Sequence, residues 1–203
     1  VGICFSLFVA AESLVCEQCM NINGTSCSGN LTTCSANSTS CEKGIKETTN
    51  GNSTTYVTFK TCARFPDCHS YFFSESIGDF HYRLLKNCCS TDNCTADPIV
   101  LPPRNNTPNG VQCPICHAEN ASICQPQGVM KCTGLETKCL TFLGKVKKLD
   151  KVVTVASRSC TTKEPCETNW FSWPDGPVLQ LSHFSCASGE NVDHHDNDGN
   201  HED

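Results

Sequence analysis

The sequence predicts an all-β, disulfide-rich protein made of two tandem domains, and three observations support this. Ten cysteines fall between Cys16 and Cys94, a density typical of a scaffold held by covalent bridges. The cysteine order recurs from Cys113 to Cys186, with successive gaps of 3, 8, 7, 7, 21, 6 and 20 residues in the first block and 3, 8, 8, 7, 21, 6 and 20 in the second. This agreement indicates an internal duplication. Short alternating segments separated by turn residues favour antiparallel strands, and no stretch favours a helix.

In the first domain, turn residues separate two pairs of extended segments. Asn50-Gly51-Asn52 is a strong hairpin turn, and the side chains after it alternate as in a half-buried strand. Gly78-Asp79 forms the second turn. The predicted strands are residues 43–48, 54–62, 70–73 and 80–85.

The second domain repeats this plan with different chemistry in its hairpins. Residues 139–143 and 152–156 are predicted strands around the lysine-rich stretch 145–151, so this hairpin has a basic tip. The next hairpin carries both tryptophans of the chain, Trp170 and Trp173, beside a Pro-Asp-Gly turn.

Composition sets the boundaries between segments. The proline-rich connection after the first domain is expected to be extended and semi-stiff, and the Asn-, Asp- and His-rich tail cannot bury enough apolar surface to order itself. The expected order is a signal peptide at residues 1–13, the first domain at 14–97, the linker at 98–112, the second domain at 113–187 and the acidic tail at 188–203. Both domains are small, so their bridges must carry much of the stability.

The first residues decide between bridged and metal-bound cysteines, because thiols in a reducing cytosol would mostly bind metal. Residues 1–11 are apolar apart from Ser6, which favours a signal peptide cut before Leu14 over a short buried strand. Cleavage would remove Cys4 and leave an even number of cysteines. We therefore expect a secreted, extracellular glycoprotein. Its expected glycosylation sites are Asn23, Asn30, Asn37, Asn52 and Asn120.

Charge and apolar patterning argue against nucleic-acid binding and against a membrane anchor. Residues 14–97 carry 6 basic and 8 acidic groups, residues 113–187 carry 8 and 6, and residues 188–203 carry 6 acidic groups and no basic one. Neither folded half has the basic stripe of a nucleic-acid binder. No apolar run reaches membrane-spanning length and no lipid-anchor motif is present, so no membrane anchor is expected.

The cysteine pattern resembles a known family. The C-x2-C start, the hairpin between the fifth and sixth cysteines and the ending Cys88-Cys89-Ser90-Thr91-Asp92-Asn93-Cys94 are similar to the three-finger domain of the lymphocyte-antigen and urokinase-receptor family. Two such domains in tandem, the second with eight cysteines, resemble the gamma-type phospholipase A2 inhibitors. Cys16-Glu17-Gln18-Cys19 and Thr25-Ser26-Cys27-Ser28-Gly29 also resemble the sodefrin precursor-like factors of salamanders.

The resemblance implies a three-finger fold for both domains and one set of disulfides, whereas the residues alone leave many pairings open. The implied pairs are Cys16–Cys41, Cys19–Cys27, Cys34–Cys62, Cys68–Cys88, Cys89–Cys94, Cys113–Cys139, Cys116–Cys124, Cys132–Cys160 and Cys166–Cys186. The sequence departs from the family twice. Thr95 stands where the family usually has Asn, and the second domain lacks the last bridge of the first.

The resemblance also implies a secreted, non-catalytic protein-binding module, most directly an inhibitor of secreted phospholipase A2. The alternative is a secreted signalling protein or courtship pheromone. The expected partner is a secreted phospholipase A2 or a receptor. The resemblance is also compatible with a homo-oligomer, because the family's inhibitors tend to assemble, but no strip of residues in the sequence predicts one. The sequence contains no G-x-S-x-G, H-E-x-x-H or P-loop motif, so we expect no enzyme activity, no cofactor and no metal.

The expected contact residues lie on two hairpins of the second domain. Trp170, Phe171 and Trp173 cluster at a hairpin tip, which has little core to bury three rings, and aromatic residues are common at binding hot spots. Lys147 and Lys148 would steer an acidic partner. The alternatives are that some rings pack onto the sheet and that the lysines form a solvated tip.

Overall fold

The computed structural model describes residues 13–64, 67–168 and 176–191. The expected signal peptide, except Ser13, and most of the acidic tail lie outside these residues. The chain divides into two compact units. Unit 1 comprises Val1–Ile45, Val57–Ser70 and Lys86–Val100, and unit 2 comprises Lys46–Tyr56, Tyr71–Leu85 and Leu101–Asp203. Unit 2 therefore combines the second sequence repeat with the ends of two hairpins of the first.

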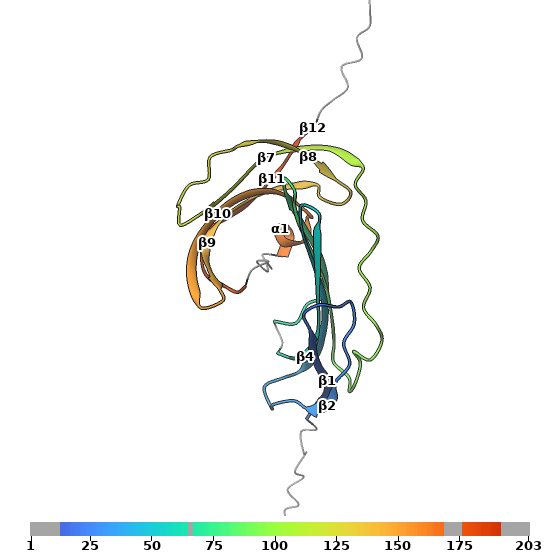
Figure 1. Ribbon diagram of the computed structural model, residues 1–203. Coiled ribbons are helices and arrows are strands. Elements are labelled where there is room, and N and C mark those ends of the chain that lie inside the picture. The colour runs from blue at the N-terminus through green and yellow to red at the C-terminus, as the bar shows by residue number, and fades with distance from the viewer. Residues whose placement is uncertain (1–12, 65–66, 169–175, 192–203) are drawn as a thin grey trace, which may run out of the picture. The chain divides into compact units, whose positions relative to one another are not determined.

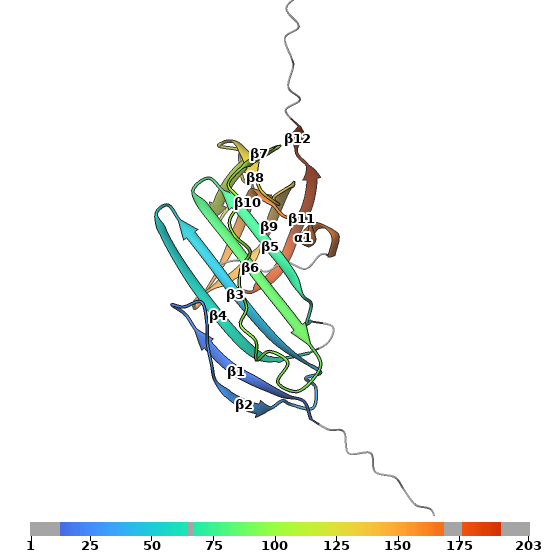
Figure 2. The same cartoon turned by 90° about the vertical axis from the view of Figure 1, so that its right-hand side faces the viewer.

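The described part of the first repeat consists of β-strands joined as successive hairpins (Figure 2). The strands are β1 (Val15–Asn21), β2 (Asn30–Thr33), β3 (Ser40–Asn50), β4 (Ser53–Ala63), β5 (Tyr71–Ile77) and β6 (Phe80–Cys89). Their hydrogen-bonded order is β5-β6-β3-β4-β1-β2, so β2 is the last of the described strands at this edge.

The hairpin turns lie where the sequence predicts them. Gly51 and Gly78 have positive φ values of 56° and 59°, in the left-handed region that glycine enters without steric cost. All four predicted strands of this repeat are confirmed. Strands β3 and β4 extend beyond the predicted segments at both ends, β5 continues to Ile77 and β6 continues to Cys89.

Unit 1 contains the edge of this sheet that is formed by β4, β1 and β2. Strand β1 pairs with β2 on one side and with β4 on the other, where Cys19 lies opposite Lys60. The Lys60 ammonium is 2.6 Å from the Glu17 carboxylate, and both side chains are nearly buried. This ion pair compensates for removing two charges from water.

The described part of the second repeat has the same strand plan plus one short helix (Figure 1). The elements are β7 (Pro108–Glu119), β8 (Gly128–Thr133), β9 (Lys138–Lys148), β10 (Lys151–Thr161), α1 (Glu164–Thr168), β11 (Val178–Ser188) and β12 (Glu190–Asn191). Strands β11, β9, β10, β7 and β8 are neighbours in that order, and β12 pairs with β7. Strand β7 begins inside the stretch predicted as linker.

Helix α1 is a type of element that the sequence did not predict. It spans five residues, which is too short for a helical pattern of apolar side chains to be visible. Glu164 and Glu167 lie in its first turn, where negative charge is favourable to the helix dipole.

The apolar core of the second repeat lies under the β9–β10 hairpin. Phe142, Val146 and Val155 are buried together, with Val153, Val178 and Phe184 packed against them. Side chains alternate along β9, so Lys145 and Lys147 are exposed on either side of the buried Val146. Strand β9 therefore continues through most of the lysine-rich stretch, and the turn itself is only Leu149-Asp150.

Unit 2 contains a direct strand pairing between the two repeats. Ser76 of β5 lies opposite Cys160 of β10, and Glu75 lies opposite Thr161. Just beyond this pairing, the Thr162 amide donates to the Ser74 carbonyl at 3.0 Å. These backbone hydrogen bonds place the hairpin of β5 and β6 in the same compact unit as the second repeat.

Nine disulfides connect the described cysteines. They are Cys16–Cys41, Cys19–Cys27, Cys34–Cys62, Cys68–Cys88, Cys89–Cys94, Cys113–Cys139, Cys116–Cys124, Cys132–Cys160 and Cys166–Cys186. These are the nine pairs named above from the family resemblance.

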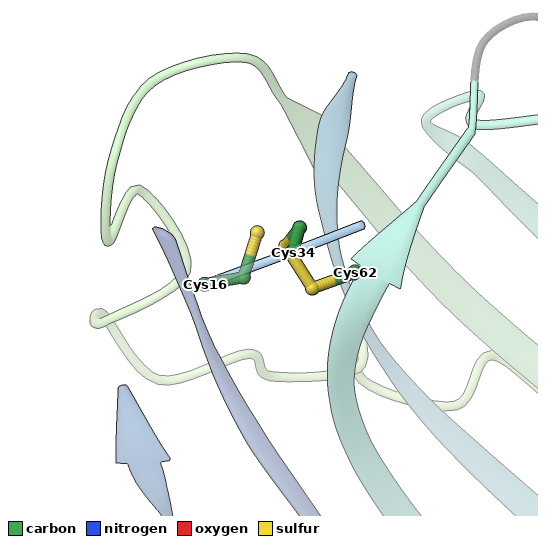
Figure 3. Close-up of side chains that lie close together, drawn as sticks. All are labelled: Cys16, Cys34 and Cys62. Atoms are coloured by element: carbon green, nitrogen blue, oxygen red, sulfur yellow. A yellow bond between two sulfur atoms is a disulfide. The ribbon is translucent and has the colours of Figure 1, made fainter. Parts of the chain in front are cut away.

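Each repeat brings several sulfurs together at the base of its hairpins. Figure 3 shows the Cys34–Cys62 bridge with Cys16 beside it. In the second repeat, the sulfurs of Cys113 and Cys132, which belong to different bridges, are 3.3 Å apart. Both groups have the compactness of a metal site. Their sulfurs are bonded in disulfides, however, and it is the thiolate that binds metal.

Removal of the Cys34–Cys62 bridge should destabilise the fold more than removal of the Cys89–Cys94 bridge. The first pair is separated by 28 residues and the second by 5. The loop-entropy relation gives about 3.5 kcal/mol for the longer loop and about 2 kcal/mol for the shorter one. Urea unfolding of the double serine variants Cys34→Ser/Cys62→Ser and Cys89→Ser/Cys94→Ser would measure both. Equal losses would contradict the prediction.

Candidate binding surface

The β9–β10 hairpin presents a basic tip, as the sequence predicts. Lys148 lies opposite Lys151 in the register, and Leu149 and Asp150 connect them. Lys145, Lys147 and Lys151 are exposed. Their charges are therefore available to an approaching molecule.

The two lysines expected to contact a partner have different surroundings. Lys147 is exposed, whereas Lys148 donates to the Glu119 carboxylate of β7 and its side chain is 23 % exposed. This hydrogen bond from Lys148 is the main cause that lowers the pKa of Glu119. Lys148 thus connects the hairpin to β7, and Lys147 is the freer charge.

Trp170, Phe171 and Trp173 lie outside the described residues, in the stretch between α1 and β11. The structure does describe the chain that follows them. Pro177, four residues after Trp173, accepts a hydrogen bond of 3.0 Å from the backbone amide of Lys147. The segment that leads into β11 therefore lies against the β9–β10 hairpin.

Strand β11 adds apolar side chains beside the lysines. Leu179 and Leu181 are each 55 % exposed, and Gln180 between them lies opposite Lys145. Exposed apolar groups beside cations favour a partner surface that is both apolar and acidic.

The expected glycosylation sites are all exposed and occur in different structural settings. Asn30 begins the edge strand β2, and Asn52 follows the glycine of the β3–β4 turn. Asn120 directly follows β7 and has a positive φ of 56°. The remaining two, Asn23 and Asn37, lie in loops. Exposure meets the steric requirement for a glycan, and occupancy stays a prediction.

A buried charge cluster in unit 2 fixes part of the linker. Both Arg83 and Glu47 are less than a tenth exposed, and they lie 3.2 Å apart; Arg104 reaches the same Glu47 carboxylate at 2.5 Å. Arg83 also donates to the Pro102 carbonyl. Burial opposes ionisation of Glu47, but the Arg104 hydrogen bond and the charges of both arginines outweigh it and lower the pKa of Glu47. Residues Pro102 and Arg104 are therefore held in place.

A second buried carboxylate lies in the same unit. Glu136 is 5 % exposed and accepts hydrogen bonds from the hydroxyls of Ser74 at 2.6 Å and Ser76 at 2.8 Å. Burial is the largest influence and raises the pKa of Glu136, although the serines and two nearby arginines oppose it. The carboxyl borders a small cavity of about 70 Å³, which is also lined by His81 and Arg104.

The contact between Ser76 and His81 does not have the arrangement of a catalytic triad. The Ser76 hydroxyl is 2.7 Å from Nδ1 of His81, but the Glu136 carboxylate bonds the serine and not the second nitrogen of the histidine. A triad needs the carboxylate on the histidine to orient it as a base. Ser76 is also 2 % exposed, so a substrate would not reach it.

Several of these features could not be found by the reasoning applied to the sequence. Glu47, Arg83 and Arg104 are far apart in the chain, and isolated charges give no signal that they meet. The prediction of a basic tip at residues 145–151 does not distinguish Leu149 from its neighbours. One signal could have identified it, because it occupies the same place between its flanking cysteines as Gly51 does in the first repeat.

Comparison with known proteins identifies the protein family. The u-PAR/Ly-6 domain matches residues 12–97 and 109–190, and the chain belongs to this family. Within the described residues, no helix has both the length and the apolar character needed to span a membrane.

Several individual proteins are similar to this chain. The chain is 31 % identical over 166 residues to a phospholipase A2 inhibitor of the gamma type from Elaphe climacophora, covering 80 % of this chain and 81 % of that protein. It is 32 % identical over 101 residues to the protein RoBo-1 of Rattus norvegicus, covering 49 % of this chain but only 41 % of that one. The crystal structure of mouse TEX101 matches with a TM-score of 0.38 and 18 % identity, over 86 % of this chain and 98 % of that one.

Truncation of Glu47 should destabilise the protein strongly. Glu47→Ala would leave the nearly buried Arg83 without its carboxylate, a change that typically costs about 3–5 kcal/mol. Arg104→Ala removes a side chain that is 30 % exposed and should cost less. Urea unfolding of both variants checks the order. A larger loss for Arg104→Ala would show that the charge of Arg83 is satisfied elsewhere.

Ionisation of Glu136 should weaken the fold as the pH rises. Its folded-state pKa lies above the ordinary value of 4.5, so its contribution to stability is complete below that value and is lost as the pH rises through the raised pKa. The variant Glu136→Gln has no proton to lose there. Unfolding midpoints measured from pH 4 upward should fall relative to those of Glu136→Gln. Glu167→Gln, at an exposed glutamate, serves as the control and should keep the wild-type pH profile.

Proposed function

We propose that this chain is a secreted, non-catalytic protein-binding module that inhibits secreted phospholipase A2. The observation that carries the proposal is the 31 % identity to a gamma-type phospholipase A2 inhibitor over four-fifths of both chains. Secretion is supported by the nine disulfides, because such bridges persist in oxidising compartments.

The framework suits inhibition by binding. Disulfides fix the bases of the hairpins, and the buried charges of Glu47, Arg83 and Arg104 fix part of the linker. Loops that are ordered before binding lose little conformational entropy when they dock. The free energy of contact then appears as affinity and is not spent on ordering the chain.

The contact surface in this proposal is the second repeat. Lys147 supplies an exposed positive charge, and Lys148, paired with Glu119, holds the hairpin in place. Trp170, Phe171 and Trp173 supply the apolar contacts from the neighbouring hairpin. This combination fits a phospholipase surface that is apolar with acidic groups around it.

The purified protein should suppress hydrolysis of phospholipid vesicles by at least one member of a panel of secreted phospholipases A2. Trp170→Ala/Trp173→Ala should weaken this inhibition at least tenfold, since tryptophans dominate binding hot spots. Ile123→Ala, at a residue 67 % exposed in the loop between β7 and β8, is the matched control and should inhibit normally. Unchanged hydrolysis across the whole panel would refute the proposed function.

A further inference from the structure

The duplication provides an internal comparison of two hairpin tips. Cys41 and Cys62 are as far apart as Cys139 and Cys160, so each residue of the first hairpin has one counterpart in the second. Gly51 corresponds to Leu149. Their φ values are 56° and 52°, so the residue at this position lies in the left-handed region in both tips.

Leucine is an unfavourable choice for this position. In the left-handed region the Cβ atom of an ordinary residue is crowded by the backbone, whereas glycine avoids the clash. The Leu149 side chain is 91 % exposed, so it does not recover the cost by packing in the fold. When no packing contact offsets the strain of a residue, the strain is a reason to consider a functional role.

The residues around Leu149 are more basic and more apolar than their counterparts in the first hairpin. Lys145, Lys147 and Lys151 stand where the first hairpin has Glu, Thr and Ser, and Val152, which is 57 % exposed, replaces a threonine. The tip of the second hairpin is therefore an exposed apolar point surrounded by cations.

The glycosylation motif of the first tip is also missing from the second. Asn52-Ser53-Thr54 is an acceptor sequence, and its counterpart is Asp150-Lys151-Val152, which is not. The first tip thus offers a site for a glycan that would cover it, and the second tip has no such site within its turn.

We infer that Leu149 is an anchor residue that inserts into an apolar recess with an acidic rim on the bound phospholipase. This inference rests on the proposed function and names the residue that makes the central contact. Lys145, Lys147 and Lys151 face the acidic rim, and Val152 extends the apolar contact.

The charges at the tip favour a protein recess over an anionic lipid surface. Asp150 is exposed directly beside Leu149 and would be repelled by a uniformly negative membrane. Lys148 is engaged with Glu119 and adds little to membrane attraction. A recess in a protein accepts a single leucine and can place its acidic groups opposite the lysines and away from the aspartate.

Leu149→Gly tests this directly, because glycine suits the backbone at this position. The variant should unfold at the same temperature as the wild type or higher, and its inhibition of the responsive phospholipase should be weakened about tenfold or more. Gly51→Leu is the matched control. A Cβ atom added there meets no atom within 4 Å, so the substitution should lower the unfolding temperature through backbone strain and leave inhibition unchanged.

Each remaining outcome decides a different point. If the wild type inhibits and Leu149→Gly inhibits equally well, the anchor is refuted and the proposed function stands. If the wild type inhibits no phospholipase, the proposed function fails and the anchor fails with it. Sedimentation with phosphatidylglycerol-containing vesicles, without enzyme, is the third arm. Binding there that Leu149→Gly abolishes would assign the tip to lipid and overturn the protein recess.

Discussion

Covalent closure at the base of each repeat is the constraint on which the remaining structure depends. In the first repeat Cys16–Cys41 packs beside Cys34–Cys62, and in the second the corresponding bridges bring the sulfurs of Cys113 and Cys132 to 3.3 Å. Repeats of this size bury too little apolar surface to be stable without such bridges. Once the bases are closed, the hairpins beyond them are free to vary in surface chemistry.

The sequence predicted the periodic and local features. Equal gaps between cysteines revealed the duplication, and Asn50-Gly51 located a turn because its conformation depends on neighbouring residues alone. The same reasoning ended strand β9 too early, at residue 143, whereas the strand continues to Lys148. Alternation of Lys145, Val146 and Lys147 marks the continuation of β9, yet the density of lysine suggested a loop. The disulfide pairing needed the family resemblance, since spacing alone leaves many combinations.

Contacts between distant residues could not be predicted in this way. Glu47, Arg83 and Arg104 meet only because β3, β6 and the linker come together in unit 2, and Glu136 accepts hydrogen bonds from serines of β5 that precede it by about sixty residues. Such meetings depend on topology, which single-sequence patterns do not encode. Of the candidate binding surface, the lysines were visible in the sequence, whereas the left-handed backbone conformation of Leu149, from which we infer its role, was not.

The edge strand β2 has a consequence for how the protein is made. All four of its residues are exposed, Leu31 among them, and an open strand edge invites pairing with another chain. The sequon at Asn30 would place a bulky sugar on that edge and block such pairing. Protein produced in bacteria, which would lack this sugar, should therefore aggregate more readily during refolding, even when all disulfides form correctly.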